Sequence, residues 1–421
     1  MKMRPALAVF LIASVAGFAF NAVSTADFVQ HLDRQTHALS CSFIPGLGRD
    51  ASGTTGCHAA LMSPYSSVLR STVWGGIPST LAGMSVFAFL TWRSVRVALG
   101  GTDRDRSEVG FLWLATLLPV LTSLFYASIS AFVLQELCKT CAGTYVSSFA
   151  AAAAGGWLFF TATKVAKPVD AEPTDAEPVE LPEVVPVTPF GGVFLKGMAE
   201  GTGFVVVPVL MYGLLVPDFS TRLGACGELI KPADPAHLFV ALGPQGAGIP
   251  SIELLDPLCP ACAAFEDRLE FSGLGSRLSR QVVLFPLDNT CNWMIGSAAH
   301  PGACTVSEAV LCAGAEAEAV IKWAFEHSEE IRVATKADPE AAGRMVKAAF
   351  PAVGSCIGTD KVRQKLNRSL RWAVANQLPI VTPQLYVGTR KLCDEDTDLG
   401  LDWALKRLID SHNEQPKKEA P

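Results

Sequence analysis

Long apolar runs separated by short polar loops dominate the first half of the chain. Most of these runs are about as long as the 20 residues that an α-helix needs to cross the hydrocarbon core of a bilayer. The pattern therefore predicts five transmembrane helices, of which the last is short and weakly bounded. They cover about residues 5–23, 73–92, 109–133, 138–161 and 200–217.

The first run has two interpretations. Lys2 and Arg4 precede it, and Ser24 to Ala26 supplies a small-x-small sequence of the kind found where signal peptides are cleaved. The apolar region of a signal peptide has about 7–15 residues, which is shorter than this run. We therefore favour a retained helix, and in both cases the chain from residue 25 onward starts outside the cytoplasm.

The basic residues between the runs predict how the helices are oriented. One side of the membrane would hold Lys2, Arg4, Arg93, Arg96, Arg104, Arg106, Lys164, Lys167 and Lys196. The other side would hold Arg34, Arg49, Arg70 and Lys139. Because cytoplasmic loops collect Lys and Arg, the first set predicts the cytoplasmic side. The chain after residue 218 then lies outside, and every cysteine lies on the outer side or at its membrane edge, where disulfides are permitted.

A segment rich in Pro, Glu and Asp divides the chain. Residues 164–189 lack the apolar residues that a packed core requires. We therefore predict a helical transmembrane domain over 1–163, an extended cytoplasmic linker over 164–196 and a fifth transmembrane helix over 197–220. An extracytoplasmic domain is predicted over 235–412.

Strand and helix patterns alternate in this last domain. Strands are predicted at 237–242, 249–255, 281–285 and 384–387, and helices at 260–270, 399–409 and through a mostly helical stretch at 305–376. A strand–helix–strand unit, a helical insertion, and then a further strand and helix predict a three-layer α/β domain.

The composition supports a membrane protein that is exposed to an oxidising compartment. Mean hydropathy is +0.32 and 18% of the residues are charged, so the chain is more apolar than an ordinary soluble protein. The net charge is −6 and no basic patch stands out, which argues against a nucleic-acid partner. Twelve cysteines are many for a protein that is kept reduced in a cytosol.

The sequence Cys-Pro-Ala-Cys at residues 259–262 lies between a predicted strand and a predicted helix. Unsatisfied N–H groups and the helix dipole at such a position stabilise the thiolate of the first cysteine. Pro260 suits the first turn of a helix. The alternatives are a structural bridge or half of a zinc site, but zinc would need a second ligand pair, and the sequence provides none in a suitable frame. The pattern therefore favours a reversible, redox-active pair.

This region resembles the thioredoxin superfamily, particularly its DsbA-like periplasmic members. Glu253 precedes Cys259 by six residues on the strand, where the family keeps a buried acid that assists proton transfer. The alternative for Glu253 is a surface position on the strand. Thr382 and Pro383 precede the last predicted strand, where the family keeps a cis-proline facing the active disulfide. The resemblance implies that Cys259 attacks and Cys262 resolves.

A second pair lies where the fourth apolar run meets the outer surface. Cys138, Cys141 and Tyr145 fit the pattern C-x-x-C-x-x-x-Y. A pair at this place can reach a partner in water and another in the lipid, although a static bridge between two helices is the alternative. The pattern resembles the vitamin K epoxide reductase family, whose bacterial homologues include proteins fused to a thioredoxin-like domain.

The first outer loop extends this second resemblance. Cys41 and Cys57 are followed by Ser63 and by the Gly-Ile-Pro sequence at residues 76–78, and the family keeps a cysteine pair, a serine and Gly-x-Pro at this place. The loop between these cysteines is longer than the family leads us to expect. A static disulfide that closes the loop is the alternative to a redox-active pair.

The remaining cysteines are Cys226, Cys291, Cys304, Cys312, Cys356 and Cys393. Six cysteines allow 15 pairings, and the sequence does not choose among them. The segment from Cys291 to Cys304 has the pattern of a loop closed by its own bridge, while Cys226 and Cys393 could tie together the base of the domain. We favour structural bridges, and a further relay pair is the alternative.

Together the resemblances imply a quinone-dependent thiol–disulfide oxidoreductase of the bacterial inner membrane, with its thioredoxin-like domain in the periplasm. Thiols of exported proteins would pass electrons through Cys259 and Cys262, then the pair in the first outer loop, then Cys138 and Cys141, to ubiquinone or menaquinone. Ser63 and Tyr145 would contact the quinone. No metal is expected. The resemblances thus imply an enzyme that makes disulfides in exported proteins.

Two other functions are compatible with parts of the sequence. An importer of electrons for disulfide reduction or isomerisation would need a cysteine within reach of the cytoplasm, which the predicted topology does not provide. A non-catalytic membrane anchor braced by disulfides would use the cysteines for stability alone. The aromatic side chains of Trp74, Trp113, Phe125, Tyr145 and Phe149 are further candidates for a quinone site, although aromatic residues in spans more often serve packing.

Overall fold

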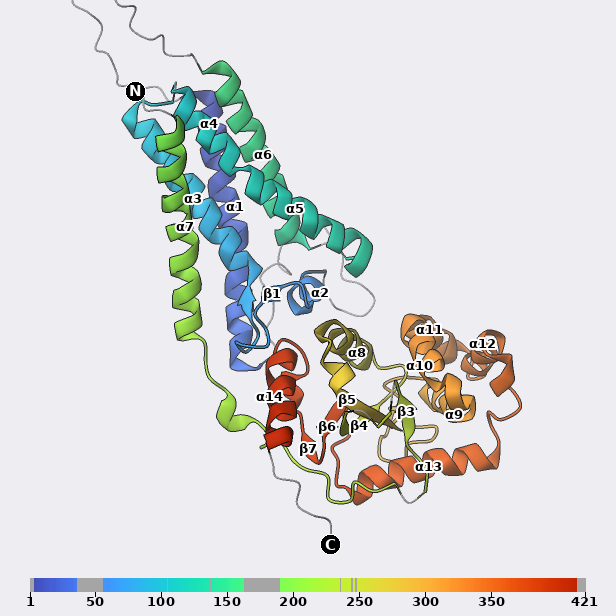
Figure 1. The fold of residues 1–421 in the computed structure, drawn as a ribbon. Coiled ribbons are helices and arrows are strands. Elements are labelled where there is room, and N and C mark those ends of the chain that lie inside the picture. Colours follow the sequence, from blue (N-terminus) through green and yellow to red (C-terminus); the bar gives the residue numbers. More distant parts are fainter. Residues whose placement is uncertain are drawn as a thin grey trace, which may run out of the picture. The chain divides into compact units, whose positions relative to one another are not determined.

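The computed structural model describes residues 4–35, 56–103, 105–136, 138–162, 190–234, 236–243, 245–246 and 248–414. The chain forms two compact units (Figure 1). The first contains Met1–Val68 and Ile77–Val216, and the second contains Leu69–Gly76 and Pro217–Pro421. Most of the predicted linker over 164–196 lies outside the described residues. Cys41 also lies outside them.

The first unit is helical. Its elements are α1 (Pro5–Gln30), α2 (Gly56–Met62), β1 (Ser67–Val68), β2 (Ile77–Pro78), α3 (Ser79–Gly100), α4 (Arg106–Ala115), α5 (Leu117–Ile129), a π-helical turn (Ser130–Leu134), α6 (Lys139–Thr161) and α7 (Phe190–Leu215). Helix α1 packs along both α3 and α6, as Figure 1 also shows. A core of Leu, Phe, Val and Ala side chains from α1, α3, α4, α6 and α7 fills the space between these helices. Apolar burial therefore holds the unit together.

Three segments of the described chain are long and apolar enough to cross a membrane, judged by length and composition: Pro5–Asp33, Arg106–Leu134 and Phe190–Arg222. Helices α3 and α6 coincide with two other predicted spans but are not in this group. Arginines in α3, and Gly, Ser and Thr in α6, dilute their apolar residues. The N-terminal unit is thus helical with candidate membrane helices.

Several predicted spans have different bounds in the structure, and the first, predicted over 5–23, continues as α1 to Gln30. The second span was predicted from residue 73, but α3 begins at Ser79, because Pro78 before it has an extended backbone and pairs with β1. The fifth was predicted over 200–217, but α7 begins at Phe190 and continues through Pro208. Hydropathy finds the apolar centre of a helix and misses ends that are polar or rich in glycine.

A buried arginine links three helices of the first unit. Arg93 of α3 is 3% exposed and donates to Glu108 of α4 at 2.6 Å and to Glu200 of α7 at 2.8 Å. Arg96 also contacts Glu200, at 3.2 Å. A buried guanidinium is costly unless it is paired with carboxylates, so these ion pairs favour one arrangement of α3, α4 and α7.

The second unit has a five-stranded sheet with the order β3-β5-β4-β6-β7. Strands β4 and β5 are parallel, and the other neighbours are antiparallel. The strands are β3 (Val240–Leu242), β4 (Ile249–Leu255), β5 (Leu278–Leu284), β6 (Gln384–Val387) and β7 (Arg390–Lys391). The helices are α8 (Pro260–Ser272), α9 (Ala303–Ala313), α10 (Ala317–Glu326), α11 (Ser328–Ala337), α12 (Ala341–Ala349), α13 (Asp360–Ala375) and α14 (Leu401–Glu414).

Helices cover both faces of this sheet. Ile252 and Leu254 of β4 pack in one apolar cluster with Leu370 of α13. Leu255 at the end of β4 belongs to the other cluster, which includes Cys262 of α8 and residues of α9 and α10. The predicted alternation of strands and helices is therefore present, with the helical insertion α9–α13 between β5 and β6 (Figure 1). The prediction missed β7 and placed the start of β3 three residues early.

Three disulfides brace the second unit: Cys226–Cys393, Cys291–Cys304 and Cys312–Cys356. The first two are the pairings that the sequence suggested for the base of the domain and for a closed loop. The third links α9 to the turn before α13. The structural interpretation of these six cysteines therefore agrees with the structure.

Residues 69–76 belong to the second unit although they follow β1 of the first. Trp74 is 2% exposed and donates from Nε1 to Asp396 at 2.8 Å, and Arg70 pairs with Asp402 at 2.8 Å. A Cβ atom at Gly400 would overlap the Trp74 indole. Trp74 is therefore a core residue of the second unit, which corrects its assignment to the second apolar span and to a quinone site.

Candidate functional site

Cys259 and Cys262 lie at the start of α8, directly after the central strand β4. Cys259 is the N-cap residue and Pro260 occupies the first turn, which suits proline because its missing N–H would be unpaired there. Both cysteines are free thiols. Cys259 is 5% exposed and Cys262 is fully buried, so Cys259 is the more accessible of the two.

The two thiols differ in acidity. The hydrogen bond from Cys262 lowers the pKa of Cys259 to about 6, opposed by burial and assisted by Thr382. Burial raises the pKa of Cys262. Cys259 is therefore the more acidic thiol of the pair, as expected for a cysteine at a helix N-terminus.

Thr382 and Pro383 lie next to this thiol, and the peptide bond between them is cis. The sulfur of Cys259 is 3.6 Å from the carbonyl oxygen of Thr382. The Thr382 hydroxyl is buried and has no other partner among the described residues, so it can donate to the thiolate. These positions agree with those that the resemblance implied.

Glu253 is buried in the middle of β4 rather than on its surface, at 1% exposure. Its Oε2 accepts from Arg280 of β5 at 2.7 Å, and Arg280 also pairs with Glu266 of α8. Burial and the neighbouring Glu266 raise the pKa of Glu253, although Arg280 opposes this. Its other oxygen is buried without a partner in the described part of the chain. The carboxyl can therefore hold a proton on the α8 side of the sheet.

Sequence reasoning missed a second acid near Cys259. Asp256 follows β4, is fully buried and binds His300, with 2.7 Å between its Oδ2 and Nδ1 of the ring. An aspartate three residues before a helix-capping cysteine is a signal for a side chain that caps the turn. His300 lies 44 residues away, and no local pattern connects the two.

The membrane-side pair has a similar local setting in the first unit. Cys138 is the N-cap residue of α6 and is bonded to Cys141 in a disulfide. The backbone N–H of Cys141 also lies 3.3 Å from the Cys138 sulfur. Thr140, between them, accepts from Ser24 of α1 at 3.0 Å. Polar side chains thus hold the end of α6 against α1.

A cysteine of the first outer loop packs against this pair. Cys57, on the short helix α2, is 7% exposed and is disulfide-bonded. It forms a cluster with Cys138, against which Ala60, Leu61 and Cys141 pack. The predicted partner of Cys57, Cys41, lies outside the described residues. The structure therefore brings one loop cysteine to the membrane-side disulfide.

The two residues predicted to contact quinone differ in their availability. Tyr145 is half-buried on α6, one turn after Cys141, and its hydroxyl has no hydrogen-bond partner within the described ranges. Ser63 follows α2 and donates to the carbonyl oxygen of Ala60 at 2.8 Å. A quinone carbonyl needs a donor, so Tyr145 fits this role, whereas Ser63 would first have to give up its bond.

The aromatic candidates do not form one site. Trp113 stacks on Phe159 near the end of α6 that is remote from Cys141. Phe125 packs edge-on against Tyr126 of the same helix. Trp113 therefore lies at the other end of α6 from Tyr145, and its stacking agrees with the packing role that the sequence favoured for these aromatic residues.

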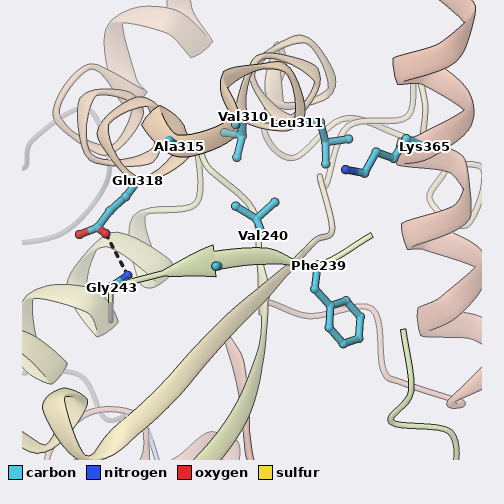
Figure 2. A pocket seen from close by; sticks show the side chains of 10 residues that line it. Phe239, Val240, Gly243, Val310, Leu311, Ala315, Glu318 and Lys365 are labelled. Carbon is cyan, nitrogen blue, oxygen red and sulfur yellow. Dashed lines mark hydrogen bonds between the residues drawn. The ribbon is translucent and has the colours of Figure 1, made fainter. Parts of the chain in front are cut away.

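The structure also contains two pockets that are not lined by any cysteine. One, of about 520 Å³, lies between β3, α9 and α13 in the second unit (Figure 2). There the carboxylate of Glu318 accepts from the backbone N–H of Gly243 at 3.1 Å, and Lys365 of α13 lies on the opposite side. The other, of about 350 Å³ in the first unit, is lined by Arg106, Trp113 and Phe159, among others.

Comparison with known proteins bears on each part of the chain. Residues 8–154 match the model of the vitamin K epoxide reductase family, which confirms the resemblance over that stretch. The chain is similar to the oxidoreductase NmDsbA1 from N. meningitidis, at 14% identity and a TM-score of 0.32, covering 47% of this chain and 99% of that one. It is also similar to the oxidoreductase DsbA from Xylella fastidiosa, at 15% identity and a TM-score of 0.29, covering 42% and 94%. A search of curated proteins finds no significant match.

Proposed function

We propose that this protein is a membrane thiol–disulfide oxidoreductase that makes disulfides in exported proteins and passes the electrons to quinone. The family match over residues 8–154 and the paired cysteines support the general class of reaction. We further propose a four-helix transmembrane domain, a fifth transmembrane helix and a thioredoxin-like domain on the periplasmic side of a bacterial inner membrane. The enzyme would act there on thiols of exported proteins.

The cluster of Cys57, Cys138 and Cys141 is the observation that carries this proposal. A disulfide that only closes a loop, or only ties two helices, gains nothing from lying against a second disulfide. Thiol–disulfide exchange, in contrast, requires the sulfurs of two pairs to meet. The contact therefore favours a relay over the non-catalytic anchor.

The first step takes place at the second unit. With Cys259 and Cys262 oxidised, a substrate thiolate attacks the Cys259 sulfur, and the electron pair of the broken S–S bond leaves on Cys262. A second substrate thiolate then attacks the mixed disulfide and releases Cys259 as a thiolate. The substrate gains one disulfide and loses two electrons and two protons, which reside on the Cys259–Cys262 dithiol.

The acidity of Cys259 supports this direction. A thiol with a pKa of about 6 is a good leaving group, and its thiolate stabilises the reduced domain. Stabilising the reduced form makes the disulfide a stronger oxidant, so the pair tends to accept electrons from substrates. We propose that Glu253 transfers the proton to and from the buried Cys262 thiol. Thr382 and Pro383 are proposed to form the surface against which the substrate disulfide is made.

The later steps repeat the exchange in the first unit. Cys259 attacks the disulfide that contains Cys57, whose proposed partner is Cys41, and Cys262 resolves the mixed disulfide. The reduced loop pair then attacks the Cys138–Cys141 disulfide. Each exchange moves two electrons and two protons, and one disulfide forms for every one that breaks.

The end of the relay calls for an acceptor of two electrons. A quinone of the ubiquinone or menaquinone type supplies this by taking up two electrons and two protons to become a quinol. Tyr145 fits as the donor to a carbonyl of that acceptor, because its hydroxyl lies on α6 one turn beyond Cys141 and is unpaired among the described residues. Ser63 is the second proposed contact.

The test uses a bacterial strain that cannot form periplasmic disulfides, with an exported reporter whose redox state is measured. We expect the intact chain to restore oxidation of the reporter, and single alanine substitutions at Cys41, Cys57, Cys138, Cys141, Cys259 or Cys262 to abolish it. Cys312→Ala together with Cys356→Ala is the matched control, because that bridge lies outside the relay. Full restoration by the Cys138→Ala chain would refute the relay.

A further inference from the structure

Asp256 carries a buried carboxylate next to the Cys259 turn. Its Oδ1 accepts from the Leu258 N–H at 2.8 Å, and its Oδ2 accepts from the Leu287 N–H at 2.7 Å. Its backbone carbonyl accepts from the Cys259 N–H at 3.1 Å. The side chain is therefore held in place by both the active-site turn and the loop after β5. A fixed negative charge here opposes ionisation of the Cys259 thiol.

His300 is the side chain that meets this charge. Its Nδ1 lies 2.7 Å from Oδ2 of Asp256, and its residue is 9% exposed. The backbone of His300 is anchored as well, since its N–H donates to the carbonyl of Leu287 at 3.0 Å. The ring thus reaches the carboxylate from a loop that has little freedom to move away.

The loop that carries His300 is closed by a disulfide. Cys291 and Cys304 are bonded to each other and enclose His300 between them. Asp288, at the base of the loop, accepts from the Gly302 N–H at 2.9 Å. The Cys291–Cys304 bridge therefore has a place in the site, because it keeps the imidazole at the Asp256 carboxylate.

The charges around His300 favour its protonated form. Burial of the ring opposes protonation, but the hydrogen bond and the charge of Asp256 outweigh burial and raise its pKa, and the Cys259 thiolate adds to this. Arg332 of α11 is the opposing cation, and it is itself paired with Glu329. Electrostatic interactions are mutual, so the imidazolium that Cys259 stabilises also stabilises the Cys259 thiolate.

We propose that His300 is a positioning residue for thiol chemistry: it stays protonated beside Asp256, compensates that buried carboxylate, and so keeps Cys259 in the thiolate form. This inference rests on one part of the proposed function, namely that Cys259 is the attacking thiol. Asp256 orders the turn through its hydrogen bonds, and His300 offsets part of the electrostatic penalty that Asp256 imposes on the Cys259 thiolate.

The first test measures the pH profile of Cys259 alkylation by iodoacetamide in the reduced full chain, followed by mass spectrometry of the peptide that contains Cys259. For His300→Gln we expect the midpoint to rise by about one pH unit, which is a tenfold slower reaction below the midpoint. His300→Lys, which restores a cation, should return the midpoint toward that of the unchanged protein. His327→Gln, at a histidine bonded to the Trp323 carbonyl, is the control and should leave it unchanged. An unchanged profile in His300→Gln would overturn the proposal.

The second test leaves His300 unchanged and measures how the Cys259 thiolate affects the titration of the His300 imidazole. The full chain is labelled with ¹³C at histidine Cε1, and the resonance missing in His300→Gln identifies His300. Replacing the thiolate by Cys259→Ser should lower the pH at which His300 titrates, because a neighbouring negative charge is gone. A His300 that is neutral at pH 7, or that titrates at the same pH in both proteins, would refute its role even if a substitution at this position impaired folding.

Both measurements are made without quinone and without a substrate protein. A chain that shows both shifts but fails to restore disulfides in the periplasm would refute the relay and support the role of His300. A chain that restores disulfides but shows neither shift would support the relay and refute the role of His300.

Discussion

Cys138 and Cys259 begin their helices with almost the same backbone. Their φ and ψ angles are −83° and 120° in the first unit and −80° and 119° in the second. Each is an N-cap residue whose sulfur lies near the N–H groups of a first helical turn. The C-x-x-C spacing and a helix start are therefore enough to produce this local geometry, whatever follows in the sequence.

The surroundings of the two cysteines differ. Cys259 lies beside Thr382 and near Asp256, with polar groups that affect its acidity. Cys138 lies against Thr140 and against Cys57, a sulfur from another element. The comparison teaches that the motif provides the same helix start in both units, while the neighbouring groups differ. In the proposed relay, these neighbours decide whether a pair exchanges with substrate proteins or with another disulfide of the same chain.

The largest expected effect is on catalytic turnover, which should distinguish the Cys138–Cys141 pair from the Cys259–Cys262 pair. Cys138→Ala should reduce continuous oxidation of a substrate dithiol by at least about 1000-fold, as for loss of a group that acts only as part of a unit. It should still permit up to two oxidations per chain, one by the preformed Cys259–Cys262 disulfide and one by the disulfide that contains Cys57. Cys259→Ala should lose both the continuous and the stoichiometric oxidation. Rapid-quench measurement of substrate oxidation checks this, and more than two turnovers per chain by Cys138→Ala would show that the membrane-side pair is not required.

The second effect concerns stability against pH in the reduced protein. The folded pKa of Cys259 is about 6, below its ordinary value of 9.0, so its stabilising contribution is complete above pH 9 and is lost as the pH falls through 6. The difference corresponds to about 4 kcal/mol of unfolding free energy for the second unit. Denaturant unfolding of the reduced chain from pH 6 to 9 measures it. In Cys259→Ser, the unfolding free energy should no longer rise with pH over this range. If it still rises, another group is responsible for the pH dependence.

A third prediction tests which unit depends on residues 69–76. Trp74→Ala removes a buried indole and its bond to Asp396, and should destabilise the second unit by about 3 kcal/mol. Hydrogen exchange of β4 and α14 should accelerate, while that of α1 and α6 should not. Trp293→Ala, at a residue that is 52% exposed, is the control and should change little. Faster exchange confined to the first unit would contradict the assignment.

The smallest expected effect is at Tyr145. Tyr145→Phe removes one hydroxyl, and the loss of one hydrogen bond of about 1 kcal/mol should raise KM for a soluble quinone about fivefold. The reactivity of Cys259 should be unchanged, which restricts the effect to the first unit. Tyr212→Phe on α7 makes the same substitution elsewhere and serves as the control. An equal effect of both substitutions would argue against a specific contact at Tyr145.

Much of the local structure was predictable because it depends on neighbours in the sequence. Apolar runs of helical length located the centres of α1, α3 and α6, and the alternation of short strands and helices located β4, α8 and β6. A cysteine pair at a strand-to-helix junction also indicated its own chemistry. The errors at element ends, such as the starts of α3 and α7, arise because polar or glycine-rich ends carry little hydropathy signal.

The sequence by itself determined the two C-x-x-C helix starts, the alternation of elements and the class of chemistry, because period, propensity and spacing act within a few residues. Tertiary structure decided the rest. It assigned Trp74 to the second unit, brought Cys57 to Cys138, and joined Asp256 to His300 across 44 residues. These contacts depend on how whole elements pack, since a side chain finds a distant partner only after burial has brought their backbones together.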